Sequence, residues 1–139
     1  MDSTRVVANE QLAIAFFAAQ DRLRGGPDPT LCAPEYTAEL GGNPPMPREH
    51  HEGFAGAFYA GFPDLRHEIV HVFSTESAAA VRFVLHGTHT GNLFGIPATG
   101  RTVRVTCNVL LVIADGRVTR LQAVFDEAGM LRQIGVLPA

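Results

Sequence analysis

The sequence contains no lysine and no tryptophan, and its basic residues are all arginines. These 11 arginines are scattered along the chain and are outnumbered by 14 acidic residues, which gives a formal net charge of −3. Proteins that bind nucleic acids normally present a concentrated basic face. The charge therefore argues against a nucleic-acid partner.

Cysteine is also scarce. Cys32 and Cys107 lie far apart without a CxxC spacing, and apolar or β-forming residues flank each of them, so we interpret them as reduced, packed thiols. The sequence has no HExxH motif and no GxSxG nucleophile elbow, and no glycine-rich stretch opens a helix as a phosphate-binding loop does. These absences argue against a metalloprotease of the HExxH type, a serine hydrolase of the GxSxG type and a nucleotide-binding protein with a phosphate-binding loop.

Long apolar runs are missing as well. None approaches the ~20 residues of a membrane-spanning helix, and the N-terminus lacks the apolar stretch of a signal peptide. We therefore expect a cytoplasmic protein with no membrane partner. With 139 residues, 46% hydrophobic and 18% charged, the chain predicts one globular domain over residues 1–139 that needs no disulfide or metal to bury a core.

Apolar residues recur at helical spacing over residues 4–23 and 48–62. We expect Ser3 or Thr4 to cap the first helix and Pro63 to end the second. The other expected elements, in order, are a helical turn and a strand over 30–40, a loop over 41–47, strands over 66–73, 78–87, 101–114 and 117–125, and a last helical turn over 127–134.

The turn between the last two strands is predicted by Asp115-Gly116, a pair typical of two-residue hairpins. Helices thus come first and antiparallel strands follow. This order predicts an α+β fold in which helices pack on one face of a curled sheet.

The second half of the chain resembles a known family. The matching segments are FPDLRHEIV from Phe62, AVRFVLHGTHTGNLFGIPATGRTV from Ala80, ADGRV from Ala114 and AVFDEAGMLRQIG from Ala123. Their order and spacing resemble those of the SnoaL-like polyketide cyclases in the nuclear transport factor 2-like superfamily. The resemblance implies a cone-shaped mixed sheet around a deep apolar cavity, chemistry without a cofactor, and commonly a homodimer or higher assembly through the sheet.

Asp126 is the candidate for acid/base chemistry. It follows the apolar run Ala123-Val124-Phe125, and a carboxylate at the inner end of a strand would be desolvated and tuned for proton transfer. Equally, the residues alone allow Asp126 to cap the short helix that follows. The resemblance favours the catalytic role, because the acid at this place is the catalytic acid/base of the family.

Three polar residues are candidates to bind a substrate carbonyl. Gln122 has the strand parity of Asp126. It falls where many family members have Trp, because Leu121-Gln122 replaces their usual His-Trp. Arg82 and Asn108 interrupt otherwise apolar strands, and for both we weigh a structural role equally or slightly higher.

The aromatic residues cluster in the helical half, and we expect most of them to belong to the hydrophobic core. In a cone-shaped fold the helices roof the cavity, so some of these rings are expected to contact a flat, hydrophobic substrate. The candidates are Phe16, Tyr36, Phe54 and Phe58.

The histidines do not predict a metal site. His67 and His71 share strand parity, but four residues separate them by roughly 13 Å, too far to share one ion. We expect both on the outer face of the sheet.

These observations together predict a cofactor-independent cyclase or isomerase for a small, hydrophobic, polyketide-like substrate. Two alternatives stay open. The same fold also carries out epoxide opening, rearrangement or cofactor-free hydroxylation, and some related domains bind small hydrophobic molecules without catalysis.

Overall fold

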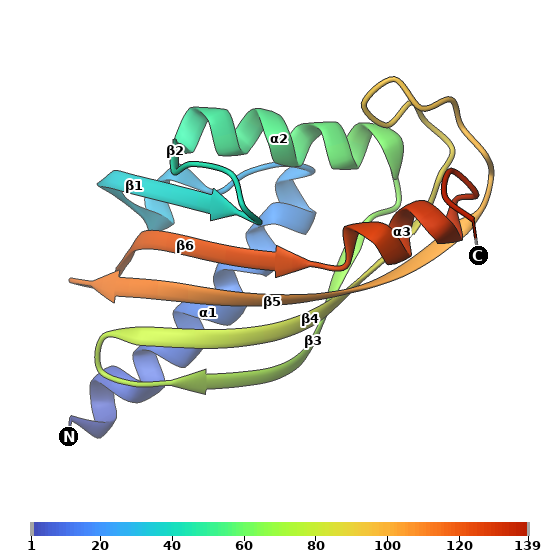
Figure 1. Cartoon of the computed structure of the whole chain (residues 1–139). Coiled ribbons are helices and arrows are strands. Elements are labelled where there is room, and N and C mark those ends of the chain that lie inside the picture. The colour runs from blue at the N-terminus through green and yellow to red at the C-terminus, as the bar shows by residue number, and fades with distance from the viewer. Residues whose placement is uncertain (1, 139) are drawn as a thin grey trace.

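The computed structural model describes residues 2–138 and combines helices with one mixed sheet (Figure 1). The helices are α1 (Ser3–Leu23), the short 3-10 helix η1 (Pro29–Leu31), α2 (Arg48–Gly61) and α3 (Glu127–Gln133). The strands are β1 (Cys32–Leu40), β2 (Met46–Pro47), β3 (Arg66–Ser74), β4 (Ala78–Thr88), β5 (Thr102–Ala114) and β6 (Arg117–Phe125). The α+β class is confirmed, and the element boundaries agree with the sequence pattern to within one or two residues, apart from the two-residue β2.

The six strands are ordered β2-β1-β6-β5-β4-β3. Strands β3 to β6 form an antiparallel meander, and β1 adds to β6 in parallel. The hairpin between β5 and β6 turns at Asp115 and Gly116, both with positive φ, as a two-residue primed turn requires. The chain thus places a strand from its helical half beside its last strand.

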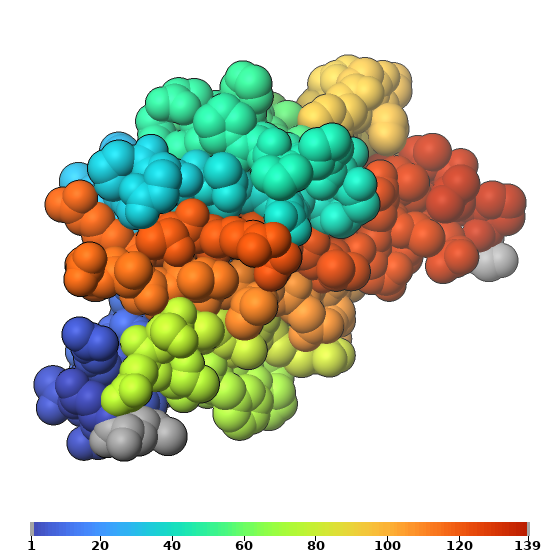
Figure 2. Space-filling model, turned by 60° about the vertical axis from the view of Figure 1, so that its left-hand side comes forward, coloured from blue at the N-terminus to red at the C-terminus, as the bar shows by residue number. Residues whose placement is uncertain are grey.

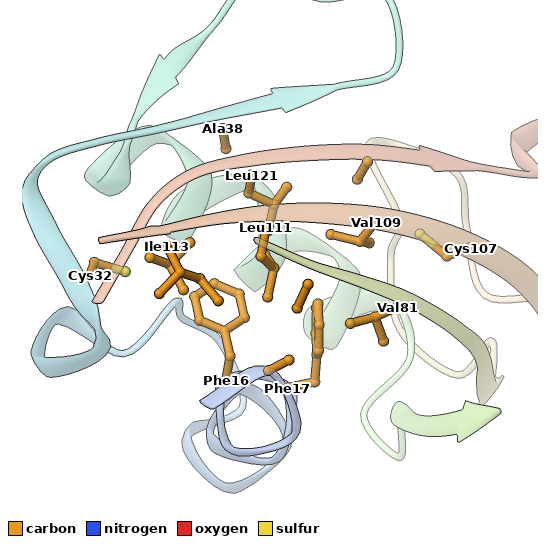
Figure 3. Close-up of a cluster of buried hydrophobic side chains, with 14 of the residues drawn as sticks. Phe16, Phe17, Cys32, Ala38, Val81, Cys107, Val109, Leu111, Ile113 and Leu121 are labelled. Carbon is orange, nitrogen blue, oxygen red and sulfur yellow. The ribbon is translucent and has the colours of Figure 1, made fainter. Parts of the chain in front are cut away.

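Helix α1 crosses one face of the sheet, here called the inner face. Phe16 and Phe17 project from α1 onto Val81, Leu111 and other apolar strand residues (Figure 3). Phe16 is fully buried. Because side chains alternate along a strand, every second residue of β5, from 103 to 113, is buried, and those from 107 to 113 join this packing.

Within residues 2–138 no helix covers the opposite, outer face, where the strands lie side by side on the surface (Figure 2). Large apolar side chains are exposed there. Phe73 is 70% exposed and Val124 67% exposed, and Leu110 lies between them in the sheet order. The outer face therefore carries exposed apolar side chains and is open within the described chain itself.

One detail differs from the sequence prediction at the helix ends. Asp2, and not Ser3 or Thr4, caps α1 by accepting hydrogen bonds from the amides of Thr4 and Arg5. The carboxylate suits this end, where the helix dipole is positive. Among the described residues, no helix is both long enough and apolar enough to cross a membrane.

Candidate functional site

An apolar cavity of about 90 Å³ lies between the inner face of the sheet and helices α1 and α2. Its wall comes from strands β1 and β3 to β6 as well as from both helices. The lining residues are Phe17, Gln20, Leu40, His51, Phe54, Ala55, Phe58, Tyr59, Leu65, His67, Phe83, Leu85, Cys107, Val109, Leu121, Ala123 and Phe125. Only a few polar groups interrupt this wall, as is typical of sites for small hydrophobic molecules.

His67 is the first of these polar groups. Its Nδ1 and Oδ1 of Asp21 are 2.7 Å apart, and its backbone amide donates to Oδ2 of the same carboxylate at 2.9 Å. The Tyr59 hydroxyl donates to Oδ1 at 2.8 Å. Burial alone would raise the pKa of Asp21, but the hydrogen bonds from His67 and Tyr59 hold that pKa below its ordinary value. An ionised carboxylate therefore stands behind the His67 ring.

His51 is the second polar group in the wall. Its ring stacks on Tyr36 at 6.0 Å between centroids, and the Tyr36 hydroxyl and His51 Nδ1 form a 2.9 Å hydrogen bond. Burial lowers the pKa of His51 to about 4 and raises the pKa of Tyr36. At neutral pH both are uncharged, so this pair adds hydrogen-bonding capacity to the cavity without adding charge.

The cysteine in the wall is chemically quiet. Burial raises the pKa of Cys107 to about 12, so its thiol stays protonated at neutral pH. A thiol is a poor nucleophile compared with the thiolate. The reactive groups of the cavity are therefore the two imidazoles and the oxygens that hold them.

Sequence and structure comparisons support one family. The model of the SnoaL-like polyketide cyclases matches residues 28–134. The chain belongs to the SnoaL-like polyketide cyclase family. Within the fold of this family, the cavity occupies the space between sheet and helices that the resemblance implied.

Several solved structures share the fold. IdmH of Streptomyces antibioticus, to which a polyketide cyclase activity is ascribed, is 28% identical with a TM-score of 0.74, over 98% of this chain and 100% of IdmH. TsrD of Streptomyces laurentii is 26% identical with a TM-score of 0.80, over 94% and 97% of the two chains. AclR of Streptomyces galilaeus, to which a hydroxylase activity is ascribed, is 22% identical with a TM-score of 0.86, over 96% and 85%. No protein with a curated description matches the sequence.

Of the aromatic residues predicted to contact a substrate, Phe54 and Phe58 line the cavity of this SnoaL-like chain. Phe16 lies deeper, in the core between α1 and the sheet. Tyr36 is also outside the lining and reaches the cavity only through its hydrogen bond to His51.

Asp126 lies at the end of β6 and is exposed. Its side chain accepts a hydrogen bond from the Gly129 amide at 2.9 Å and so caps α3. Leu121, Ala123 and Phe125 face the cavity, so strand alternation turns Asp126 outward. The structure thus gives Asp126 the cap position and solvent exposure, in place of the desolvated position that we expected.

Gln122, Asn108 and Arg82 also lie outside the cavity. All three line a hollow on the outer face, together with His71 and Phe73. Asn108 and Arg82 are paired neighbours in the β4–β5 ladder. Gln122 further donates to Glu39 at 2.9 Å. The three residues share the outer face and not the cavity face, because the apolar alternate residues of these strands are buried on the inner side.

His67 lies on the inner face of the sheet, in the cavity wall, and not on the outer face that we expected. We expected the two histidines, His67 and His71, on the same side of the strand, because residues four apart in a regular strand point the same way. The β3–β4 register shifts between Ile69 and His71, and a shift of one residue exchanges the faces. His67 therefore lines the cavity while His71 lies outside. Its partner Asp21 comes 46 residues earlier in the chain, and no local pattern predicts that contact.

Proposed function

We propose that this protein is a cofactor-independent cyclase or isomerase for a small, hydrophobic, polyketide-like carbonyl compound. The observation that carries the proposal is the apolar cavity whose wall is interrupted by two hydrogen-bonded imidazoles. Membership of the SnoaL-like family supports the same substrate class.

The reaction requires removal of a proton next to a carbonyl, formation of an intramolecular carbon–carbon bond, and return of the proton to the new alkoxide. An apolar pocket favours such a step by holding the reacting carbons together. In this proposal His51, uncharged at neutral pH because its pKa is about 4, donates to the carbonyl oxygen while the Tyr36 hydroxyl holds its other nitrogen.

Asp126 stays our sequence-based prediction for an acid/base residue of this reaction. It follows Phe125, which is in the cavity wall, and it must leave its hydrogen bond to Gly129 to reach a substrate. Gln122, Asn108 and Arg82 remain substrate-binding predictions only for a ligand that extends to the outer hollow.

The Asp126→Asn variant tests the role of Asp126. Asparagine caps helices about as well as aspartate, so the variant should keep its stability, whereas Asp126→Ala should lose about 1 kcal/mol. We expect Asp126→Asn to abolish cyclisation of short poly-β-ketone esters, followed by mass and ultraviolet absorbance, and to retain their binding. Native turnover in a stable Asp126→Asn protein would remove Asp126 from the mechanism.

The second candidate is a hydroxylase or another reaction on the same fold, and the hydroxylase activity ascribed to AclR favours it. Product mass distinguishes the two, because cyclisation leaves the composition unchanged or loses water, whereas hydroxylation adds oxygen. Tight binding of every ester without turnover would instead support a non-catalytic binding module.

A further inference from the structure

We propose that His67 is a proton-transfer residue of the cavity and that Asp21 is the residue that positions it. This inference rests on the proposed acid/base function of the cavity but assigns the proton transfer to a side chain of β3. It is independent of Asp126.

The hydrogen bonds of His67 define which ring nitrogen is available. Asp21 occupies Nδ1 at 2.7 Å, and an ionised carboxylate can only accept, so the neutral ring carries its proton on Nδ1. Nε2 then has a free lone pair. This nitrogen has no hydrogen-bond partner among residues 2–138. It is not fully buried, because the only fully buried side-chain nitrogen or oxygen without a partner in these residues is His89 Nε2. His67 Nε2 therefore keeps accessible surface, in a side chain that lines the cavity.

The ring is held in place by its surroundings. It packs against Phe17 and Phe83, with centroid distances of 5.4 and 4.7 Å, and its side chain is 7% exposed. The Asp21 carboxylate is fixed in turn by the Tyr59 hydroxyl and the His67 amide. A base that is oriented by a carboxylate, which also stabilises the imidazolium formed on proton uptake, is the arrangement that acid/base catalysis requires.

The charged and titratable groups around the pair come from α1, its C-cap residue and α2. Asp21 lies on α1 and Tyr59 on α2, and the guanidinium of Arg24 lies 4.7 Å above the Tyr59 ring while donating to the Leu65 carbonyl. Arg24 therefore interacts with Tyr59 and Leu65, and Asp21 remains the carboxylate that contacts His67.

Other hydrogen bonds also attach α1 to the sheet. Asn9 donates to the Thr75 carbonyl at 2.9 Å, and the Ser74 hydroxyl donates to the Val6 carbonyl at 2.8 Å. These bonds hold the other end of α1 on the β3–β4 hairpin. They supply matched structural controls at a distance from the cavity wall.

A second histidine–carboxylate pair supplies a chemical control. His86 Nε2 and Glu68 Oε1 are 2.8 Å apart, with side chains 24% and 50% exposed. Neither residue lines the cavity. The two pairs therefore have the same chemistry but differ in access to the apolar cavity.

The probe is 5-nitrobenzisoxazole, a small flat molecule whose elimination needs only a base. His67 Nε2 removes the proton from C3, the C–H electrons form the nitrile, and the N–O bond breaks to leave 2-cyano-4-nitrophenolate. The proton moves from Nε2 to water afterwards, so no other reactant is required. The coloured phenolate gives the rate directly.

We expect His67→Gln to lower kcat/KM for this probe by at least roughly 100-fold and Asp21→Asn by at least about 10-fold. His86→Gln should stay within about twofold, as expected for a histidine outside the cavity. Asp21→Asn should also move the His67 ring away from the Nδ1–H tautomer, because the amide that replaces the carboxylate can donate to Nδ1. Asn9→Ala should lower stability and leave that tautomer in place.

Nitrogen-15 NMR of the native protein tests the pair without any substitution. We expect the Nδ1–H tautomer for His67, whereas a free histidine ring prefers Nε2–H. An Nε2–H tautomer, a native protein no faster than free imidazole, or a folded His67→Gln variant with the native rate would each overturn the proposal.

The outcomes separate this inference from the proposed function. A His67-dependent probe reaction in a protein that converts no poly-β-ketone ester would support His67 and reject the cyclase. Cyclisation at the native rate in His67→Gln would support the cyclase and reject His67.

Discussion

The inner and outer faces of the sheet are made by alternate residues of the same strands, yet their environments are opposite. On β5, Cys107 and Val109 lie in the cavity wall, while Asn108 between them is exposed on the outer face. Helix α1 covers the inner face, and within the described residues no helix covers the outer one. The polar candidates from the sequence lie on the open face, and the polar groups of the cavity come from elsewhere.

This difference shows that a polar residue in an otherwise apolar strand indicates first which face of the sheet is uncovered. It is weaker evidence for a binding or catalytic site. Arg82, Asn108 and Gln122 interrupt β4, β5 and β6 at positions where a polar side chain reaches water. In the cavity wall, by contrast, His51 and His67 are tolerated because each has a hydrogen-bond partner. The groups that distinguish the cavity are therefore pairs, and the sequence shows only single residues.

The largest expected effect comes from the inner face. Phe16 is fully buried between α1 and the sheet, so Phe16→Ala should lower the free energy of unfolding by about 3–5 kcal/mol through lost burial and the cavity left behind. Urea unfolding followed by circular dichroism measures it. Ile14 lies on the same helix but is 43% exposed, and Ile14→Ala should cost clearly less. Equal losses at both positions would mean that α1 is not buried as described.

Much of the fold was predictable from local patterns. The spacing of apolar residues gave α1 and α2, alternation gave β3 to β6, and Asp115-Gly116 gave the hairpin with positive φ at both residues. These features depend on residues close in the sequence. The parallel pairing of β1 with β6 joins segments about 80 residues apart and carries no local signal.

The candidate site was less predictable for the same reason. Strand parity groups alternate residues such as Gln122 and Val124, but parity alone does not say which group faces the helices. The register shift in β3 moved His67 onto the inner face, and its contact with Asp21 is long-range. Phe54 and Phe58 were found because α2 has a regular apolar stripe above the cavity.

A second, intermediate effect concerns the pH dependence of stability. Burial lowers the pKa of His51 to about 4 from its ordinary 6.5, so the unfolded chain takes up a proton first as the pH falls. The contribution of His51 to the free energy of unfolding is therefore fully present above pH 6.5. It decreases by roughly 3 kcal/mol as the pH falls from 6.5 towards 4. Urea titrations at a series of pH values measure this slope.

The neighbouring His50 supplies the matched control. It is exposed on the same helix, so His50→Gln should keep the native slope, while His51→Gln should flatten it. The loss of the hydrogen bond to Tyr36 also lowers the stability of His51→Gln at every pH, and this offset is separate from the slope. An unchanged slope in His51→Gln would place the pH dependence in other groups.

The smallest expected effect on the folded monomer lies on the outer face. Phe73 is 70% exposed and stacks on His71 at 6.0 Å, so Phe73→Ala should change the free energy of unfolding at low protein concentration by less than about 0.5 kcal/mol. We predict a homodimer through this outer face, because exposed apolar side chains such as Phe73, Leu110 and Val124 would be covered in such a contact. The same substitution should therefore weaken self-association, as measured by sedimentation equilibrium. The buried-face substitution Phe16→Ala should instead lower mainly the stability of the fold. A native protein that stays monomeric at high concentration would contradict the homodimer, and a loss of several kcal/mol at low concentration would show that the outer face is packed within the single chain. Only the second result would remove the contrast between the two faces.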